Sequence, residues 1–192
     1  QQQWDKTCIN WDTKAIRAGV LADQHQLKIT SVEAEPGIDD KTWNTVTESF
    51  FRVHDSMPFT NTATRMKLLC DKKNLYVRIE SLHPLKHPED FYQRAPDTDT
   101  FSQEYVELAI APPTAGGKVY RLAANPVEGS RYDSVNTPGK GGLSEDKSWN
   151  GTWQFRFAVT GQKGPYSLPD RVWTAWFKIP FSELGSAPQP GE

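Results

Sequence analysis

Residues 101–126 read FSQEYVELAIAPPTAGGKVYRLAANP, and this stretch decides the fold that we expect. Apolar and polar residues alternate on both sides of a Pro- and Gly-rich segment at residues 112–117, which predicts two strands joined by a turn. Because strand side chains alternate, the first strand carries an aliphatic row on one face: Val106, Leu108 and Ile110. Tyr105, Glu107 and Ala109 fall on the opposite face.

The carboxylate of Glu107, in mid-strand opposite that aliphatic row, has two interpretations. It can belong to a solvated outer face, as polar strand residues usually do. It can instead face a ligand, since a carboxylate accepts two hydroxyl hydrogen bonds at once. The sequence leaves both open.

The same period of two recurs along much of the chain. Residues 65–70 and 75–80 form the clearest hairpin, with a turn at residues 71–74. Further strands are predicted at residues 27–32, 50–54, 132–134, 153–159 and 172–179. Residues 138–146, rich in Gly and charge, read as a mobile loop, and Asp12 can cap a short helix over residues 13–22. We therefore expect an all-β antiparallel sandwich of about nine strands with a short, partly helical N-terminal extension.

Composition and motifs exclude several classes of function. The chain has 192 residues and a formal net charge of -2, without the basic excess of a nucleic-acid binder. Its apolar runs are too short for a membrane-spanning helix. Motifs of nucleophilic, phosphate-binding and zinc-dependent enzymes do not occur, so we expect no enzymatic activity. Cys8 and Cys70 can form one disulfide or remain two separate thiols.

Several short motifs, taken in order, resemble carbohydrate-binding module family 9 and its DOMON-like relatives. The central one is Phe101 with Gln103-Glu104, then Glu107 and the Asn125-Pro126 pair. Others flank it on both sides: Ile38-Asp39 with Trp43, Asn74-Leu75-Tyr76-Val77, Ile179-Pro180-Phe181-Ser182 and Leu184-Gly185. The resemblance spans residues 27–192, which we treat as one jelly-roll-like domain, and leaves residues 1–26 as the extension.

The resemblance implies a module that stacks sugar rings on aromatic side chains and binds their hydroxyls through Glu and Asn. It makes Glu107 and Asn125 the polar anchors, and the platforms are Phe101, Trp149 and Trp176. Relatives can also bind a structural calcium ion, for which the oxygen donors here would be Asp39, Asp40 and Asp99. Trp43, in contrast, is expected to be buried.

Three departures from the family pattern affect these expectations. Trp176 stands where relatives commonly carry Glu, so it is either a replacement platform or packed under the N-terminal extension. Ala123 lies near a position where some sugar-binding members have a basic donor. Relatives also continue with further strands after Phe181, so either the sandwich lacks its last strands or the fold closes with other material.

The expected partner is an oligosaccharide or polysaccharide, and the expected setting is a secreted or periplasmic protein with other domains. Two alternatives remain. A haem-binding domain of the same superfamily would draw its ligands from two Met and three His: Met57, Met66, His54, His83 and His87. A structural docking module would bind no ligand.

Overall fold

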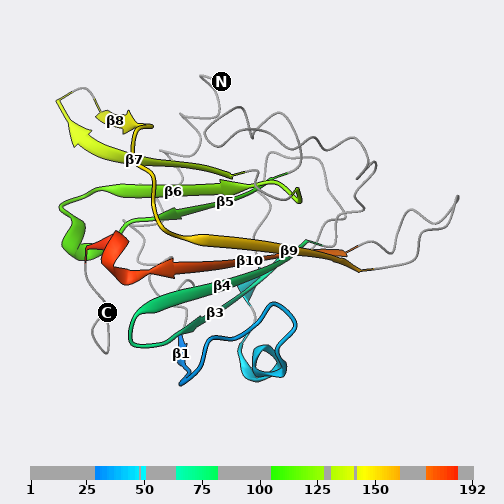
Figure 1. Cartoon of the computed structure of the whole chain (residues 1–192). Helices are drawn as coiled ribbons and strands as arrows, with labels where there is room; N and C mark the ends of the chain where they lie inside the picture. Colours follow the sequence, from blue (N-terminus) through cyan, green and yellow to red (C-terminus); the bar gives the residue numbers. More distant parts are fainter. Residues whose placement is uncertain are drawn as a thin grey trace, which may run out of the picture.

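The computed structural model describes residues 29–47, 49–50, 64–81, 105–127, 131–140, 142–160 and 172–185. In these residues two β-sheets face each other and form a sandwich (Figure 1). The helices described are short 3-10 turns: η1 (Lys41–Thr45), η3 (Pro113–Ala115) and η4 (Phe181–Leu184). The prediction of an all-β sandwich is confirmed. The predicted helix over residues 13–22 lies outside the described residues.

The first sheet has the order β1-β3-β4-β10-β9, and β2 also pairs with β3. Its strands are β1 (Thr30–Ser31), β2 (Ser49–Phe50), β3 (Thr64–Cys70), β4 (Asn74–Ser81), β9 (Gln154–Thr160) and β10 (Val172–Pro180). The pairs are antiparallel except that β1 runs parallel to β3. The long apolar strand β10 lies between β4 and β9, which places its inward residues at the centre of the core.

The second sheet is a meander in chain order, β5-β6-β7-β8. Its strands are β5 (Val106–Ile110), β6 (Val119–Ala124), β7 (Arg131–Gly139) and β8 (Gly142–Asp146). The turn predicted between β5 and β6 is confirmed, and it takes left-handed backbone at Gly116 and Gly117. The loop predicted at residues 138–146 is wrong, because residues 138–139 and 142–146 pair as the end of β7 and all of β8. Gly142, with a φ of 117°, allows the tight reversal between them.

The hairpin of β3 and β4 is confirmed, and its turn is fixed by one carboxylate. Asp71 Oδ1 accepts hydrogen bonds from the backbone N–H of Lys73 at 2.7 Å and of Asn74 at 2.6 Å. Asp71 Oδ2 also accepts one from the Tyr76 hydroxyl at 2.6 Å. The strand predicted at residues 27–32 shortens to β1 in the described part of the chain.

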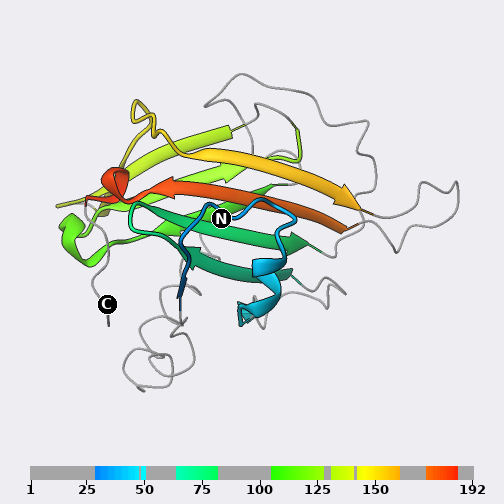
Figure 2. The same ribbon diagram turned by 60° about the horizontal axis from the view of Figure 1, so that its bottom comes forward.

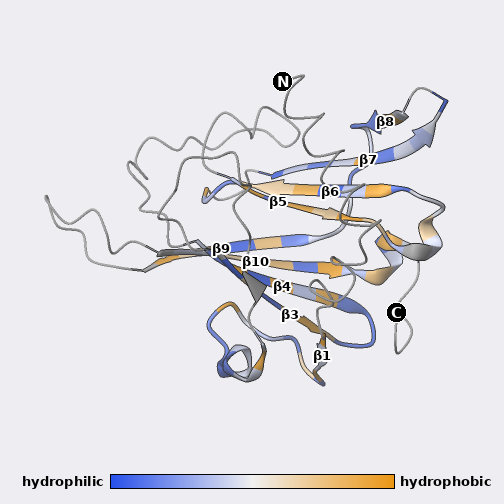
Figure 3. Cartoon of the chain, turned by 180° about the vertical axis from the view of Figure 1, so that it is seen from behind, coloured by the Kyte–Doolittle hydropathy of each residue, from blue (hydrophilic) through white to orange (hydrophobic). Residues whose placement is uncertain are grey.

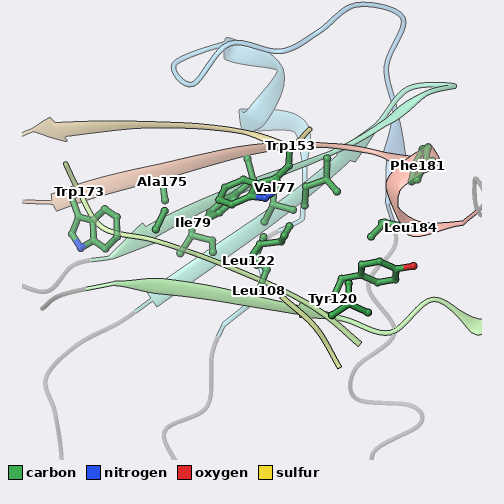
Figure 4. Close-up of a cluster of buried hydrophobic side chains, with 14 residues drawn as sticks. Val77, Ile79, Leu108, Tyr120, Leu122, Trp153, Trp173, Ala175, Phe181 and Leu184 are labelled. Carbon is green, nitrogen blue, oxygen red and sulfur yellow. The ribbon is translucent and has the colours of Figure 1, made fainter. Parts of the chain in front are cut away.

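The main core lies between the two sheets (Figure 4). Leu108 and Leu122 from the second sheet face Val77, Ile79 and Ala175 from the first. Aromatic rings fill the remaining volume: Trp153 stacks on Phe177 with ring centroids 5.8 Å apart. Burial of each such large apolar side chain contributes about 1.5–3 kcal/mol to folding. The aliphatic row predicted on β5 therefore faces the core.

A second apolar cluster lies on the outer face of the first sheet, under residues 29–47. Figure 2 shows this covering segment, in blue and cyan, in front of the first sheet. It contains five buried residues: Trp43, Val46, Leu69, Tyr76 and Trp176. Long-range hydrogen bonds fix the covering segment, with Trp176 Nε1 donating to the Pro36 carbonyl at 3.0 Å and Arg78 Nε to the Ile38 carbonyl at 2.9 Å. Trp43 is buried, as predicted. One outer face of the sandwich is thus covered by the chain itself.

Candidate functional site

A row of charged side chains crosses the outer face of the second sheet. Arg121 on β6 donates from Nε to Glu107 Oε1 at 2.6 Å and from Nη1 to Glu145 Oε1 at 3.0 Å. The register accounts for this row, because Arg121 pairs with Ala109 on β5 and with Ser134 on β7. Glu107 is therefore a diagonal neighbour of Arg121 on the same face. Glu145 lies on β8, on the far side of β7.

Two hydroxyl groups of β7 donate hydrogen bonds to Glu145 in this row. The Tyr132 hydroxyl donates to Glu145 Oε1 at 2.6 Å, and the Ser134 hydroxyl donates to the same oxygen at 3.1 Å. Both residues are buried. Lys147 follows, with its Nζ 3.7 Å from Glu145 Oε2 and 5.8 Å from the centre of the Tyr132 ring. Charge of opposite sign thus alternates along the row from Glu107 to Lys147.

The hydrogen bonds of the row keep Arg121 and Glu145 in their charged states. The hydrogen bond to Glu107 raises the pKa of Arg121, and the one from Tyr132 lowers the pKa of Glu145. Burial raises the pKa of the Tyr132 phenol, and its hydrogen bond to Glu145 adds to this effect. At neutral pH Arg121 is therefore a cation, Glu145 a carboxylate and Tyr132 a neutral phenol.

The side chains of the row remain partly accessible to solvent although hydrogen bonds hold them in place. The exposed fractions of the side chains are 25% for Glu107, 29% for Arg121 and 31% for Glu145. Tyr105 precedes β5 on the side of Glu107 and is 41% exposed. An exposed aromatic ring beside fixed donors and acceptors is chemically suited to a polyhydroxylated ligand with an apolar ring face.

Of the two predicted polar anchors, only Glu107 lies in this row. Asn125 follows β6 and is completely buried. Its carbonyl accepts the backbone N–H of Val127 at 2.7 Å, within the bend that ends the strand. The side chain of Asn125 thus presents no surface to a ligand. Phe101 lies outside the described residues, so its predicted role as a platform stays a prediction.

The two predicted tryptophan platforms lie elsewhere. Trp149 is half-buried and packs edge-on against Tyr120, a core residue, with centroids 5.3 Å apart. Trp176 is completely buried in the cluster under residues 29–47, and the Arg156 guanidinium lies 5.2 Å from its ring centre. This burial contradicts the interpretation of Trp176 as a platform. Trp176 packs under residues 29–47 instead. The expected N-terminal extension, residues 1–26, lies outside the described residues.

The predicted calcium donors do not form a cluster in the described part of the chain. No group of three acidic, His or Cys side chains that could hold a metal occurs among the described residues. The Asp40 carboxylate accepts the backbone N–H of Thr42 at 2.8 Å and its hydroxyl at 2.6 Å, and so caps η1. Asp39 is exposed, and Asp99 lies outside the described residues.

The residues proposed for a haem are largely outside the described ranges. Among them only Met66 is described, and it packs against the main core from β3. Cys70 is a free, half-buried thiol, while Cys8 is not among the described residues. No helix in the described ranges has the length and apolar character needed to cross a membrane.

Sequence reasoning missed Arg121, Tyr132 and Glu145. The signal for Arg121 was present, because period two places it on the same face as Ala123, where a basic donor was sought. Glu145 was not recognised as a site residue, because its strand was predicted to be a loop. Asp133 was also missed: this buried carboxylate on the inward side of β7 binds the N–H groups of Gly151 and Trp153.

Comparisons with known proteins give a likeness of fold. No family model and no curated protein matches the chain. A protein of Bacteroides uniformis ATCC 8492, proposed to bind carbohydrate, matches with a TM-score of 0.60 and 11% identity over 85% of this chain and 76% of its own. This match supports the shared sandwich fold.

Two structures of a family 9 carbohydrate-binding module from Caldicellulosiruptor kristjanssonii also match. The module in complex with glucose has a TM-score of 0.46 and 16% identity, over 79% of this chain and 66% of its own, just under two thirds. The one with cellotriose has a TM-score of 0.45 and 17% identity, over 81% and 67%.

Proposed function

We propose that this chain is a non-catalytic carbohydrate-binding module whose ligand lies on the outer face of the β5–β8 sheet. The observation that carries the proposal is Arg121, held between Glu107 and Glu145 on the accessible side of the sheet. The opposite outer face is covered by residues 29–47. The fold shared with a bacterial protein proposed to bind carbohydrate supports the same function.

The chemistry of the row suits hydroxyl groups. A sugar hydroxyl both donates and accepts, so it can bind a carboxylate oxygen of Glu107 and an N–H of Arg121 at once. Because the two side chains already hold each other, little conformational freedom is lost on binding. Tyr105, exposed next to Glu107, offers a ring face for the apolar side of a pyranose, and Phe101 is proposed to extend that platform.

The same geometry favours binding over catalysis. Glycoside hydrolysis needs two carboxylates on either side of the scissile bond, one of them able to give up a proton. Here both carboxylates bind one guanidinium, and the pKa of Glu145 is lowered. Neither is arranged as a general acid. A module of this kind is further proposed to act outside the cytoplasm, attached to other domains.

A glycan array tests the proposal with wild type beside Glu107→Gln. The matched control is Glu80→Gln, because Glu80 also pairs with an arginine, Arg78, on the outer face of the other sheet. Its exposed fraction of 23% is close to the 25% of Glu107. We expect wild type and the control to bind the same glycans, and Glu107→Gln to bind about tenfold or more weakly. Failure of the folded wild type to bind any glycan would refute the function.

A further inference from the structure

Glu145 lies on a strand that contributes no buried side chain. All residues of β8 are exposed, and Figure 3 shows much of β7 and β8 in hydrophilic colours. The Glu145 side chain is nevertheless tied to β6 through Arg121 and to β7 through Tyr132 and Ser134. Its position therefore depends on the pairing of β8 with β7 and on the hydrogen bonds of its own carboxylate.

One oxygen of the Glu145 carboxylate accepts all three of these hydrogen bonds. Oε1 accepts from the Tyr132 hydroxyl at 2.6 Å, from Arg121 Nη1 at 3.0 Å and from the Ser134 hydroxyl at 3.1 Å. The shortest of the three comes from Tyr132, and this bond is also the first cause of the lowered pKa of Glu145. A free Glu side chain would lose conformational entropy when a ligand fixed it, whereas this carboxylate is already fixed.

Tyr132 itself is too deeply buried to contact a ligand on the outer face. It is 4% exposed and Ser134 is completely buried. The side chains of Arg121 and Glu145, in contrast, are 29% and 31% exposed. Any effect of the Tyr132 hydroxyl on sugar binding must therefore pass through the side chain that it holds.

Arg121 is held from two sides. Its Nε donates to Glu107 Oε1 at 2.6 Å, and its Nη1 donates to Glu145 Oε1 at 3.0 Å. Two carboxylates at different nitrogens fix both the reach and the rotation of the planar guanidinium. Loss of Glu145 would remove one of these two contacts and give the guanidinium more freedom.

We propose that the Tyr132 hydroxyl is a positioning group of the sugar site: it holds Glu145, and Glu145 holds Arg121 in the orientation that binds the sugar. This proposal rests on the proposed function and adds how its site is ordered before the ligand arrives. Because Tyr132 acts through Glu145, removal of its hydroxyl weakens binding only while the Glu145 carboxylate is present.

A double-mutant cycle tests this dependence, with affinities measured by titration calorimetry. The four proteins are wild type, Tyr132→Phe, Glu145→Ala and the double variant. The probes are glucose, galactose, xylose and mannose and the β-1,4-linked disaccharide of each. If wild type binds none of these, the cycle uses the glycan with the strongest signal on the array.

We expect Glu145→Ala to bind about tenfold more weakly than wild type and Tyr132→Phe about threefold more weakly. The double variant should match the tenfold loss of Glu145→Ala rather than reach the loss of about thirtyfold that independent effects would give. The matched control is Tyr120→Phe, because Tyr120 is also a buried tyrosine of this sheet but packs in the main core. Its affinity should equal that of wild type.

The pH dependence of binding gives a second readout, which a purely structural role would not change. Without the hydrogen bond from Tyr132, the lowered pKa of Glu145 rises toward its ordinary value. The charged groups that face Glu145 from β6 and from the end of β8, Arg121 and Lys147, are the same in both proteins. As the pH is lowered, Tyr132→Phe should therefore lose affinity at a higher pH than wild type, and Tyr120→Phe should follow wild type.

The outcomes separate the two proposals. Full affinity in Tyr132→Phe or in Glu145→Ala, or losses that simply add in the double variant, would overturn the positioning role and leave the proposed function standing. A glycan array without any bound glycan would overturn both.

Discussion

Replacement of the buried Asp133 by Ala should destabilise the sandwich more than removal of an exposed side chain. Asp133 is completely buried, and its Oδ2 accepts from Gly151 N at 2.8 Å, Trp153 Nε1 at 2.7 Å and Arg131 Nη2 at 2.9 Å. Arg131 also lies 4.5 Å from the centre of the Trp153 ring. One carboxylate thus attaches the segment before β9 to β7.

The magnitude follows from the groups that the substitution leaves without their acceptor. Each of the two buried N–H donors, on Gly151 and Trp153, costs about 1–3 kcal/mol when its partner is removed. Breaking a largely buried ion pair costs about 3–5 kcal/mol. Because these effects overlap at one atom, we expect Asp133→Ala to lose about 3–5 kcal/mol in total. Asp133→Asn keeps one acceptor oxygen and should lose less.

Urea unfolding followed by tryptophan fluorescence measures this loss. For a chain of this size it corresponds to a melting temperature lower by about 6–20 °C. The control is Asp39→Ala, an exposed aspartate, with an expected change within about 0.5 kcal/mol. A loss below about 1 kcal/mol in Asp133→Ala would refute the role of Asp133.

Two further predictions concern the close packing before β9 and the β3–β4 turn. A Cβ on Gly151 would lie 2.7 Å from Trp149 Cη2 and 2.9 Å from Trp153 Cδ1, so Gly151→Ala should lower the free energy of unfolding in urea by about 1–3 kcal/mol. The control Gly37→Ala should be neutral, because a Cβ there meets no atom within 4 Å. Equal effects of the two substitutions would contradict this prediction. Burial alone would raise the pKa of Asp71, but hydrogen bonds, first from Tyr76, lower it. Its folded-state pKa is thus depressed, so its stabilisation is complete above the unfolded pKa of about 3.9 and is lost as the pH falls through the folded value. The urea midpoint of wild type should therefore fall more steeply below about pH 4.5 than that of Asp71→Asn, and parallel curves would refute this.

The sequence predicted those parts of the fold that depend on local alternation. The β3–β4 and β5–β6 hairpins follow from period two and from turn residues close to their strands. Trp176 could not be assigned in this way, because both faces of β10 carry apolar residues. Its cover comes from Pro36, 140 residues away in the sequence, and such a contact leaves no local pattern.

The candidate site was predictable only as far as the face of one strand. Alternation on β5 placed Glu107 opposite the aliphatic row, on the side where Arg121 holds it. The contact to Glu145 needed the register of β6, β7 and β8 together, and Gly and charged residues in β8 resemble a loop. Asn125 and Trp149 carry polar and aromatic groups typical of sugar sites, but packing directs them inward.

The central claim is that a saccharide binds on the outer face of the β5–β8 sheet. An NMR titration of the ¹⁵N-labelled protein with an array-positive glycan tests it most directly, since each backbone amide reports its own surroundings. We predict that the largest shifts fall near Glu107, Arg121 and Glu145, with the amides of Tyr76 and Trp176 unchanged. Largest shifts on the first sheet, or no shifts at saturating glycan, would contradict the account.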